Sequence, residues 1–283
     1  MNIVGFGGAG CKIAELFEEY PQYDVYYVDI GLTAPSSFAL PQTSTMEQAE
    51  QKTPIFEELK KMSGPVIFIC AGGGRTSGSI LAFLEQIKQL DITVLYIQPD
   101  KNLLNKESAL REKITFNILQ HFARSGLFKK VILFNNLEMS KILDNLSILE
   151  YYNKINSSIV NAVHMLNYFK NTDSVVKSVS EPLEVNRITT IGLYKIEEEE
   201  EKYFFDVENI REKNFYFAFN EDTLKNELNL LNKIGEKMKK AGQSEFTDVS
   251  YNITATTYEK SFAYIEAHTN FVQGEKIVDN NSE

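Results

Sequence analysis

The sequence predicts an α/β fold with a doubly wound parallel sheet, a long central helix and a smaller α+β domain at the C-terminal end. Short apolar runs without alternation, such as residues 66–70, are typical of strands buried on both faces of a parallel sheet. These runs alternate with segments of helical apolar spacing, as doubly wound sheets require. Strands beyond the central helix alternate in polarity instead. We therefore expect domains at 1–148 and 171–275, joined by a helix at 149–170 and followed by a flexible tail at 276–283.

The composition argues against several classes of protein. The 283 residues, 43% of them hydrophobic, suffice for a substantial core. A net charge of −10 argues against direct nucleic-acid binding, which needs clustered Lys and Arg. No apolar run approaches the roughly 20 residues of a membrane span, and the chain begins directly with a strand, so we expect a cytoplasmic protein without membrane insertion. Cys11 and Cys70 are too few for a disulfide framework or a metal cluster, so we expect reduced thiols.

The first strand, expected at residues 2–6, runs into a glycine-rich turn. Gly5, Gly7 and Gly10 have the spacing of a GxGxxG dinucleotide-binding motif. The second strand, at 25–28, ends in Asp29, nineteen residues after Gly10, where a dinucleotide-binding fold places its ribose-binding acid. An NAD- or FAD-binding domain therefore fits this segment. The same strand, turn and helix can serve any phosphate.

A second glycine loop follows the strand at 66–70. Gly72, Gly73 and Gly74 lead into a hydroxyl-rich turn, and a helix with its apolar stripe between Ile80 and Leu90 comes next. Glycines let backbone N–H groups approach an anion closely, and a helix N-terminus adds donors and a favourable dipole. This arrangement predicts a cradle for a di- or triphosphate. The alternative is a flexible glycine-rich linker between two core elements.

Apolar spacing predicts the other elements of the first domain. Residues 31–62 are expected to be mostly loop, with a short helix at 56–62, and strands are expected at 92–98 and 130–134. Two helices are expected where apolar residues share one face: Leu110, Ile114, Ile118, Leu119 and Phe122 in the first, and Tyr152, Ile155, Ile159, Val163 and Leu166 in the central helix.

The C-terminal domain is expected to contain strands in hairpin-like succession and one amphipathic helix. The strands lie at 188–196, 214–219, 249–257 and 262–268, and the helix at 223–240. The acidic run from Glu197 to Glu201 is expected to be a solvated loop between two strands.

Two glycine loops followed by a long helix and a second domain resemble the tubulin/FtsZ family, and its plasmid- and phage-borne members most of all. The family motif GGGTGTG is matched without a gap by Gly72, Gly73, Gly74, Arg75, Thr76, Ser77 and Gly78. The first phosphate loop of the family is similar to Gly7, Gly8, Ala9, Gly10, Cys11 and Lys12. Asp29 ends the second strand as in FtsZ.

The resemblance implies further nucleotide contacts. Glu107 and Arg111 keep the Glu-x3-Arg spacing of residues that contact the sugar and base. Tyr152 and Asn156 match the family's aromatic and amide at the guanine, where a ring stacks on the base and an amide offers a donor and an acceptor. The alternative for Tyr152 is ordinary core packing.

The sequence departs from the family at two places. Arg75 and Thr76 replace Thr-Gly, so a cation stands in the second loop and can pair with phosphate bidentately. The alternatives are that the loop binds its ligand differently or that Arg75 forms an ion pair on the surface. The family's loop after the central helix reads roughly GxxNxD, and this chain offers only Asn171, Thr172 and Asp173. The resemblance makes Asp173 the catalytic acid, with Glu181 or Glu184 as substitutes. The alternative for Asp173 is a solvated turn or a helix N-cap.

The resemblance implies that the protein binds GTP or GDP with Mg²⁺ between subunits, self-associates head-to-tail into filaments and hydrolyses GTP on assembly. It also implies an adaptor or cargo protein as a possible partner. One alternative is a scaffold that keeps the fold and has lost GTPase activity. Another is a dinucleotide-dependent oxidoreductase, which the second glycine loop and the lack of an evident catalytic His, Lys or Tyr constellation disfavour.

Overall fold

A computed structural model describes residues 1–144, 146–242 and 247–274. The predicted flexible tail at 276–283 lies outside the described residues. No helix in the described part of the chain is long and apolar enough to cross a membrane.

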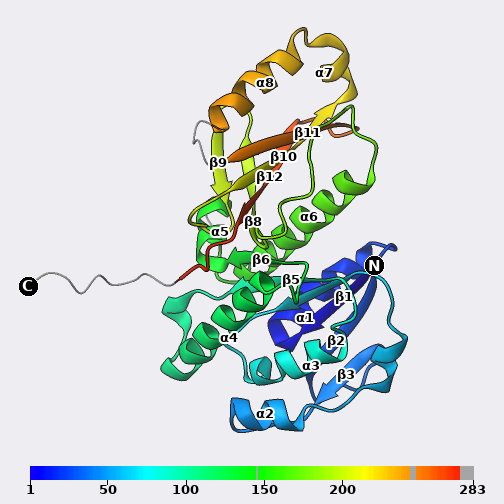
Figure 1. Cartoon of the computed structure of the whole chain (residues 1–283), viewed down its shortest axis with the longest axis vertical. Coiled ribbons are helices and arrows are strands. Elements are labelled where there is room, and N and C mark those ends of the chain that lie inside the picture. Colours follow the sequence, from blue (N-terminus) through cyan, green and yellow to red (C-terminus); the bar gives the residue numbers. More distant parts are fainter. Residues whose placement is uncertain (145, 243–246, 275–283) are drawn as a thin grey trace, which may run out of the picture.

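The first half of the chain forms a parallel sheet with helices on both faces, so the predicted doubly wound α/β fold is confirmed (Figure 1). The strand order is β3-β2-β1-β4-β5-β6, which is the classic doubly wound order. The chain reverses direction across the sheet between β1 and β4. The strands are β1 (Asn2–Phe6), β2 (Asp24–Ile30), β3 (Ser37–Leu40), β4 (Val66–Cys70), β5 (Ile92–Gln98) and β6 (Lys130–Asn135).

Two apolar layers hold the helices against this sheet. Ile13, Phe17 and Ile159 bring one set of helices onto one face, and Phe83 and Leu119 bring another set onto the other face. The first set is α1 (Gly7–Glu15), the 3-10 turn η1 (Leu16–Glu19), α5 (Asn136–Leu143) and α6 (Tyr151–Asn171). The second set is α3 (Ile80–Gln86) and α4 (Lys106–Arg124), with α2 (Met46–Lys52) beside α3. Shorter 3-10 turns are η2 (Glu57–Lys61), η3 (Arg75–Ser79) and η4 (Lys101–Leu103).

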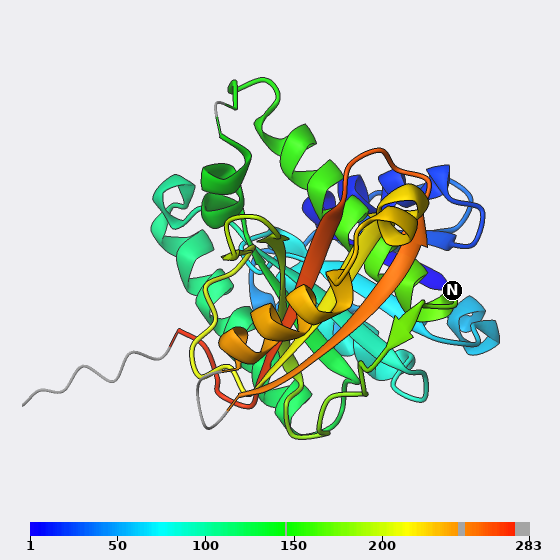
Figure 2. The ribbon, with the colours of Figure 1, turned by 90° about the horizontal axis from the view of Figure 1, so that it is seen from above.

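The C-terminal strands continue the same sheet, because β8 pairs in parallel with β6. The order beyond β8 is β12-β10-β11-β7, and β9 pairs with the other part of β8. Helix α8 lies over this part of the sheet (Figure 2), and its Ile234 and Met238 share a buried cluster with Phe215 and Phe217. The elements are β7 (Val176–Lys177), β8 (Ile188–Lys195), β9 (Glu200–Tyr203), β10 (Glu212–Asn220), α7 (Glu221–Asn226), α8 (Leu230–Ala241), β11 (Asp248–Thr256) and β12 (Phe262–Thr269).

The predicted hairpin-like succession of the C-terminal strands is wrong. β10 and β11 follow each other but pair in parallel, and β12 inserts between β8 and β10. A parallel pair needs a crossover connection, which α7 and α8 provide. The predicted single helix at 223–240 is broken because Asn229 takes a left-handed conformation, with φ of 63°.

Other local predictions also need correction. The segment at 31–62 holds β3 and α2, and its end forms η2 where a short helix was expected. The acidic run forms the predicted exposed turn between two strands only up to Glu199, and Glu200 and Glu201 already belong to β9. The predicted apolar face of α4 is wrong, since Leu110 and Ile114 are 59% and 38% exposed. Its inward face instead carries Glu112, Thr115 and Gln120 with Phe116 and Leu119.

Candidate functional site

The two glycine loops meet at the carboxyl edge of the parallel strands. One loop follows β1 and the other follows β4, the two strands between which the sheet reverses. A Cβ built on Gly7 would lie 2.6 Å from Thr76 Oγ1, and Gly7 has a φ of +69°. Only glycine fits this contact and this backbone conformation readily. Ligands of doubly wound sheets bind in the crevice at such a switch point.

The first loop is the beginning of helix α1. Phe6 is extended and α1 begins at Gly7, the next residue, so the chain turns from strand into helix without a spacer. No side chain caps this N-terminus, and its first turn carries no acid. Its backbone N–H groups are therefore donors for an anion. Lys12 is exposed in the second turn.

The side chains of Asp29 and Cys11 lie against the first loop. Asp29 Oδ2 would lie 3.8 Å from a Cβ on Gly8, while Asp29 Oδ1 accepts a hydrogen bond from Ile30 N at 2.8 Å. The Cys11 thiol donates to Gly5 O at 3.3 Å, and burial raises the pKa of this thiol to about 11. Cys11 therefore remains protonated and holds α1 to the end of β1.

The second loop is rigid and closely packed. Ser77 Oγ donates to Gly74 O at 2.7 Å, and Thr76 and Ser77 are buried. A Cβ on Gly72 would overlap Tyr96 OH, so the loop lies directly on β5. A Cβ on Gly78 would lie 2.5 Å from Met46 O, so this glycine lets the start of α2 approach the loop.

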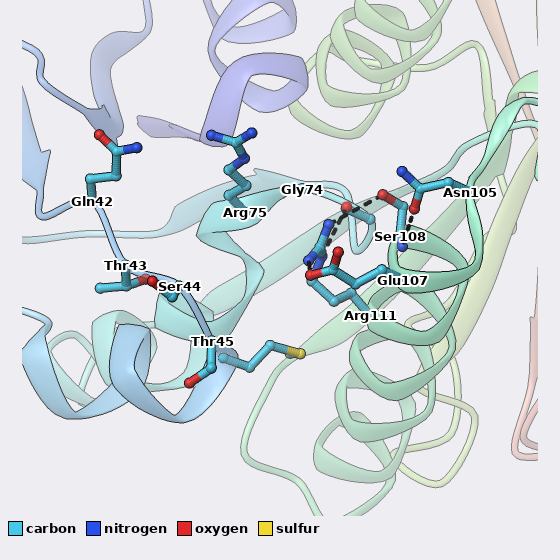
Figure 3. Close-up of a pocket in the computed structure, with 12 residues that line it drawn as sticks. Gln42, Thr43, Ser44, Thr45, Gly74, Arg75, Asn105, Glu107, Ser108 and Arg111 are labelled. Atoms are coloured by element: carbon cyan, nitrogen blue, oxygen red, sulfur yellow. Dashed lines mark hydrogen bonds and ion pairs between the residues drawn. The ribbon is translucent and has the colours of Figure 1, made fainter.

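A cavity of about 580 Å³ opens between the second loop and helix α4 (Figure 3). Arg111 joins its two walls, because Arg111 Nε donates to Gly73 O at 3.3 Å and Nη2 donates to Ser108 Oγ at 3.2 Å. Arg111 also forms an ion pair with Glu107. Arg75 is exposed, and Figure 3 shows its guanidinium extended away from Arg111. The lining residues are Gln42, Thr43, Ser44, Thr45, Met46, Gly73, Gly74, Arg75, Asn105, Glu107, Ser108 and Arg111.

Next to the wall of this cavity that α4 forms, buried polar side chains make a hydrogen-bonded network. Glu112 is 3% exposed and accepts from Tyr96 OH at 3.2 Å and from Gln98 Nε2 at 2.9 Å. Gln98 Oε1 accepts from Asn135 Nδ2 at 2.7 Å, and Asn135 Oδ1 caps helix α5. This network links the carboxyl ends of β5 and β6 to α4. Next to it, the buried Oδ1 of Asn136 has no hydrogen-bond partner among the described residues, so this acceptor can still take a hydrogen bond from a ligand.

Most predicted nucleotide-binding residues lie along this one edge. Gly73, Gly74, Arg75, Glu107 and Arg111 line the cavity, and the first loop and Asp29 adjoin it through the contact of Gly7 with Thr76.

Tyr152 and Asn156 lie on the first turns of α6. Helix α6 begins at the same edge, because Tyr151 OH donates to Asn136 O at 3.3 Å. Tyr152 is 54% exposed, so its predicted place on the apolar stripe of α6 is wrong. Asn156 is half-buried.

Asp173 lies elsewhere. Helix α6 has 21 residues, so its ends are separated by about 30 Å. Asp173 is exposed just beyond the far end. It therefore cannot reach a nucleotide bound at the glycine loops of its own chain.

Sequence reasoning did not single out residues 42–46 of the cavity wall or the polar groups of Asn105, Gln98 and Glu112. Two signals were present. Thr45 and Gln48 form a T-x-x-Q capping box, and Thr45 Oγ1 accepts from Gln48 N at 3.2 Å. Asn105 is an N-cap that accepts from Ser108 N at 2.8 Å. No local sequence pattern marks Gln98 and Glu112 as buried polar residues.

No protein-family model and no curated protein matches this chain in sequence. Solved structures match it in fold. FtsZ of M. jannaschii, solved as an empty dimer, gives a TM-score of 0.69 at 15% identity over 96% of this chain and 88% of that one. TubZ of Bacillus thuringiensis serovar israelensis, in a GTPγS-form protofilament, gives 0.71 at 13% identity over 94% and 86%. CetZ2 of Haloferax volcanii, in a GTPγS-bound protofilament, gives 0.69 at 14% identity over 98% and 94%.

The chain therefore has the tubulin/FtsZ fold. The matches span the parallel sheet, the central helix and the C-terminal strands, so the resemblance of the glycine loops extends to the whole architecture. At these identities the chain is a divergent example of that fold. A dinucleotide-binding domain of the dehydrogenase type accounts for the first strands alone.

Proposed function

We propose that this protein binds GTP between head-to-tail subunits, assembles into filaments and hydrolyses GTP on assembly. The observation that carries the proposal is that the two glycine loops meet at the reversal point of the sheet, beside the cavity that Arg111 lines. The fold neighbours support it, since their solved forms include protofilaments, two of them with GTPγS.

The residues present fit a nucleotide. The uncapped N-terminus of α1 offers backbone donors to phosphate, and Lys12 and Arg75 add one positive charge to each glycine loop. The sugar and base would extend towards Glu107, Asn136 and Tyr152. Asn136 Oδ1, buried without a partner in the described structure, could accept a hydrogen bond from a purine.

The site also fits Mg²⁺ that is held mainly by phosphate and water. No group of three His, Cys, Asp or Glu side chains in the described residues could hold a metal ion by itself. Mg²⁺ commonly keeps several waters and takes phosphate oxygens as ligands. Thr76 and Asp29 would reach the ion directly or through water. When bound, Mg²⁺ would neutralise charge on the phosphates.

The separation of Asp173 from the glycine loops supports hydrolysis between subunits. In a head-to-tail contact, two different surfaces of each subunit meet, so the far end of α6 would face the nucleotide of the next subunit. Asp173 would orient a water molecule by accepting its hydrogen bond. The water oxygen bonds to the γ-phosphorus as the bond from that phosphorus to the bridging oxygen breaks. GDP leaves with the bridging oxygen, and inorganic phosphate forms.

A substitution at Gly73 tests the nucleotide site. A Cβ there would meet Ser108 O at 3.4 Å and Leu104 Cδ2 at 3.7 Å, which are ordinary van der Waals contacts. Gly73→Val would place a branched side chain where phosphate approaches, so GTP affinity should fall about tenfold or more, with backbone donors no longer reaching their partner. The measurements are the identity of the nucleotide that copurifies with wild type and the GTP affinity of both proteins.

Gly235 on α8 provides the control, because a Cβ there would meet nothing within 4 Å. Gly235→Ala should bind GTP as wild type does. Unchanged GTP affinity in folded Gly73→Val would contradict the proposed site. Filaments that form with GTP but release no phosphate would favour the scaffold alternative, for which the replacement of Thr-Gly by Arg75 and Thr76 is the specific argument.

A further inference from the structure

The far end of α6 is held by a cluster around the buried carboxylate of Glu266, which the nucleotide site does not use. Glu266 on β12 is 1% exposed. Its Oε1 accepts a hydrogen bond from Lys130 Nζ at 2.9 Å, and its Oε2 lies 2.6 Å from Lys170 Nζ. Tyr216 OH donates to Oε2 at 3.0 Å, and Lys170 Nζ lies 5.6 Å from the centre of the Tyr216 ring. We call Lys130, Lys170, Tyr216 and Glu266 the Glu266 cluster.

The Glu266 cluster connects three parts of the molecule at one carboxylate. Lys130 begins β6 of the first sheet half, Lys170 lies in the last turn of α6, and Tyr216 and Glu266 belong to the C-terminal strands β10 and β12. Removing one partner from a buried charge pair leaves the other uncompensated, which is costly. The position of the end of α6 relative to the C-terminal strands is therefore fixed by charge as well as by packing.

The loop that carries Asp173 is short and is fastened on both sides. Asp173 follows Lys170 by three residues. On the other side, Val175 N donates to Ile253 O at 2.7 Å, and β7 then pairs with β11. With so little chain between these two attachments, the attachments determine where the Asp173 carboxylate lies.

We propose that the Glu266 cluster positions Asp173 for hydrolysis on the neighbouring subunit, with Lys170 as the positioning residue. This inference rests on the proposed function. It adds that the C-terminal strands help to place the catalytic residue. Loss of the Lys170–Glu266 contact would free the end of α6 and let the Asp173 loop move. Small displacements of a catalytic group lower the rate strongly, while nucleotide affinity about 30 Å away should not change.

Lys170 is the member of the cluster that can respond to pH. Its side chain is 37% exposed, against 18% for Lys130 and 2% for Glu266. Burial of its ammonium lowers the pKa of Lys170 to about 8, and the like charge of Lys130 lowers it too, against the attraction of Glu266.

Lys130, Tyr216, Glu266 and His268 keep their charge states between pH 7 and 9. Although burial opposes it, the two lysines hold the pKa of Glu266 well below its usual range. Glu266 outweighs the effect of burial on Lys130 and raises the pKa of Lys130. Burial raises the pKa of Tyr216 and lowers that of His268 to about 3, so both are neutral. Glu181 adds a carboxylate near Lys130 and Tyr216. Raising the pH through about 8 therefore removes charge from Lys170, which weakens its contact with Glu266.

The test compares wild type, Lys170→Met, Lys170→Arg and Asp173→Asn, with Lys239→Met on the exposed side of α8 as control. Phosphate release per unit of sedimented polymer and GTP affinity are measured for the full chain between pH 6.5 and 9. Lys170→Met should lose about tenfold or more in hydrolysis per polymer with unchanged GTP affinity. Lys170→Arg should keep the rate and remove the alkaline fall expected of wild type, because arginine stays charged at these pH values. Lys239→Met should match wild type.

The outcomes separate the two proposals. Wild-type hydrolysis per polymer in Lys170→Met, or an alkaline fall in Lys170→Arg equal to that of wild type, would overturn the positioning role while Asp173→Asn remains inactive. Full activity in Asp173→Asn would overturn the catalytic role of Asp173, and with it the positioning role. Wild-type filaments without phosphate release would overturn both. If Lys170→Met does not fold, the pH profile of Lys170→Arg still decides.

Discussion

Arg75 is the residue at which this chain departs most from the glycine motif that it resembles. Its side chain is exposed at the mouth of the cavity and extends away from Arg111 (Figure 3). If Arg75 pairs with the terminal phosphate, Arg75→Thr should weaken GTP binding by about 1.5–3 kcal/mol, the range for hydrogen bonds to charged groups. GDP binding should weaken less, and the loss for GTP should be larger at low salt. Titration of both nucleotides at two ionic strengths measures this difference.

Arg124→Thr is the matched control, since Arg124 is exposed in the last turn of α4 and does not line the cavity. It should leave both affinities unchanged. Equal weakening of GTP and GDP by Arg75→Thr would instead assign Arg75 to the protein surface or to a contact between subunits.

Residue types revealed the two glycine loops because a turn that approaches phosphate or backbone closely needs glycine. Gly7 and Gly78 illustrate this, with built Cβ atoms 2.6 Å from Thr76 Oγ1 and 2.5 Å from Met46 O. The resemblance also selected Arg111, through its Glu-x3-Arg spacing from Glu107, but its structural contact could not be predicted. Its guanidinium binds Gly73 O, 38 residues away, and holds the second loop against α4.

At the scale of single elements, helix α6 divides into a packing face and an exposed first turn. Ile159 is fully buried against the sheet, whereas Tyr152 is 54% exposed at the end nearest the glycine loops. Ile159→Ala should therefore cost about 2–5 kcal/mol of unfolding free energy. Tyr152→Ala should change stability by no more than about 0.5 kcal/mol, as for other surface sites. If Tyr152 stacks on the base, nucleotide binding should weaken by about 1–3 kcal/mol.

Denaturant unfolding and nucleotide titration of the same two variants check this division. A large loss of stability in Tyr152→Ala would return Tyr152 to the core. Normal nucleotide affinity in Tyr152→Ala would remove it from the base site, and the half-buried Asn156 would remain the candidate on this helix.

Elements were predictable where apolar spacing alone determines burial. The strands β1, β4 and β5 and the helix α6 follow such spacing closely. Helix α4 does not, because Glu112 and Gln120 face inward and are satisfied by distant partners, Gln98 and Gln273. Spacing treats both as surface residues. The polar groups that decide the orientation of α4 come from β5 and from the segment that follows β12.

At the scale of the whole molecule, the sheet runs without a break from the nucleotide edge into the C-terminal strands. The parallel pairing of β6 with β8 makes this junction, with Val131 opposite Ile188. Pairing across so many residues leaves no local pattern, so sequence reasoning expected a separate unit of hairpins. The continuous sheet supports α6 along its length (Figure 1). Helix α6 begins at the edge that carries the glycine loops, and Asp173 follows its last residue by two positions.

This two-ended arrangement predicts how Asp173→Ala behaves in mixtures. Because Asp173 lies beyond the far end of α6, the variant monomer should bind GTP with wild-type affinity. Filaments should still form with GTP, and they should persist longer since hydrolysis is slowed by loss of the group that orients water. When the variant is mixed with wild type, turnover should fall in proportion to the variant fraction, because each defective subunit acts on the nucleotide of its neighbour. Phosphate release and light scattering across a series of mixing ratios measure both effects. Hydrolysis per unit polymer equal to wild type would show that another acid, such as Glu181 or Glu184, orients the water, and substitution of each in the Asp173→Ala background would then identify it.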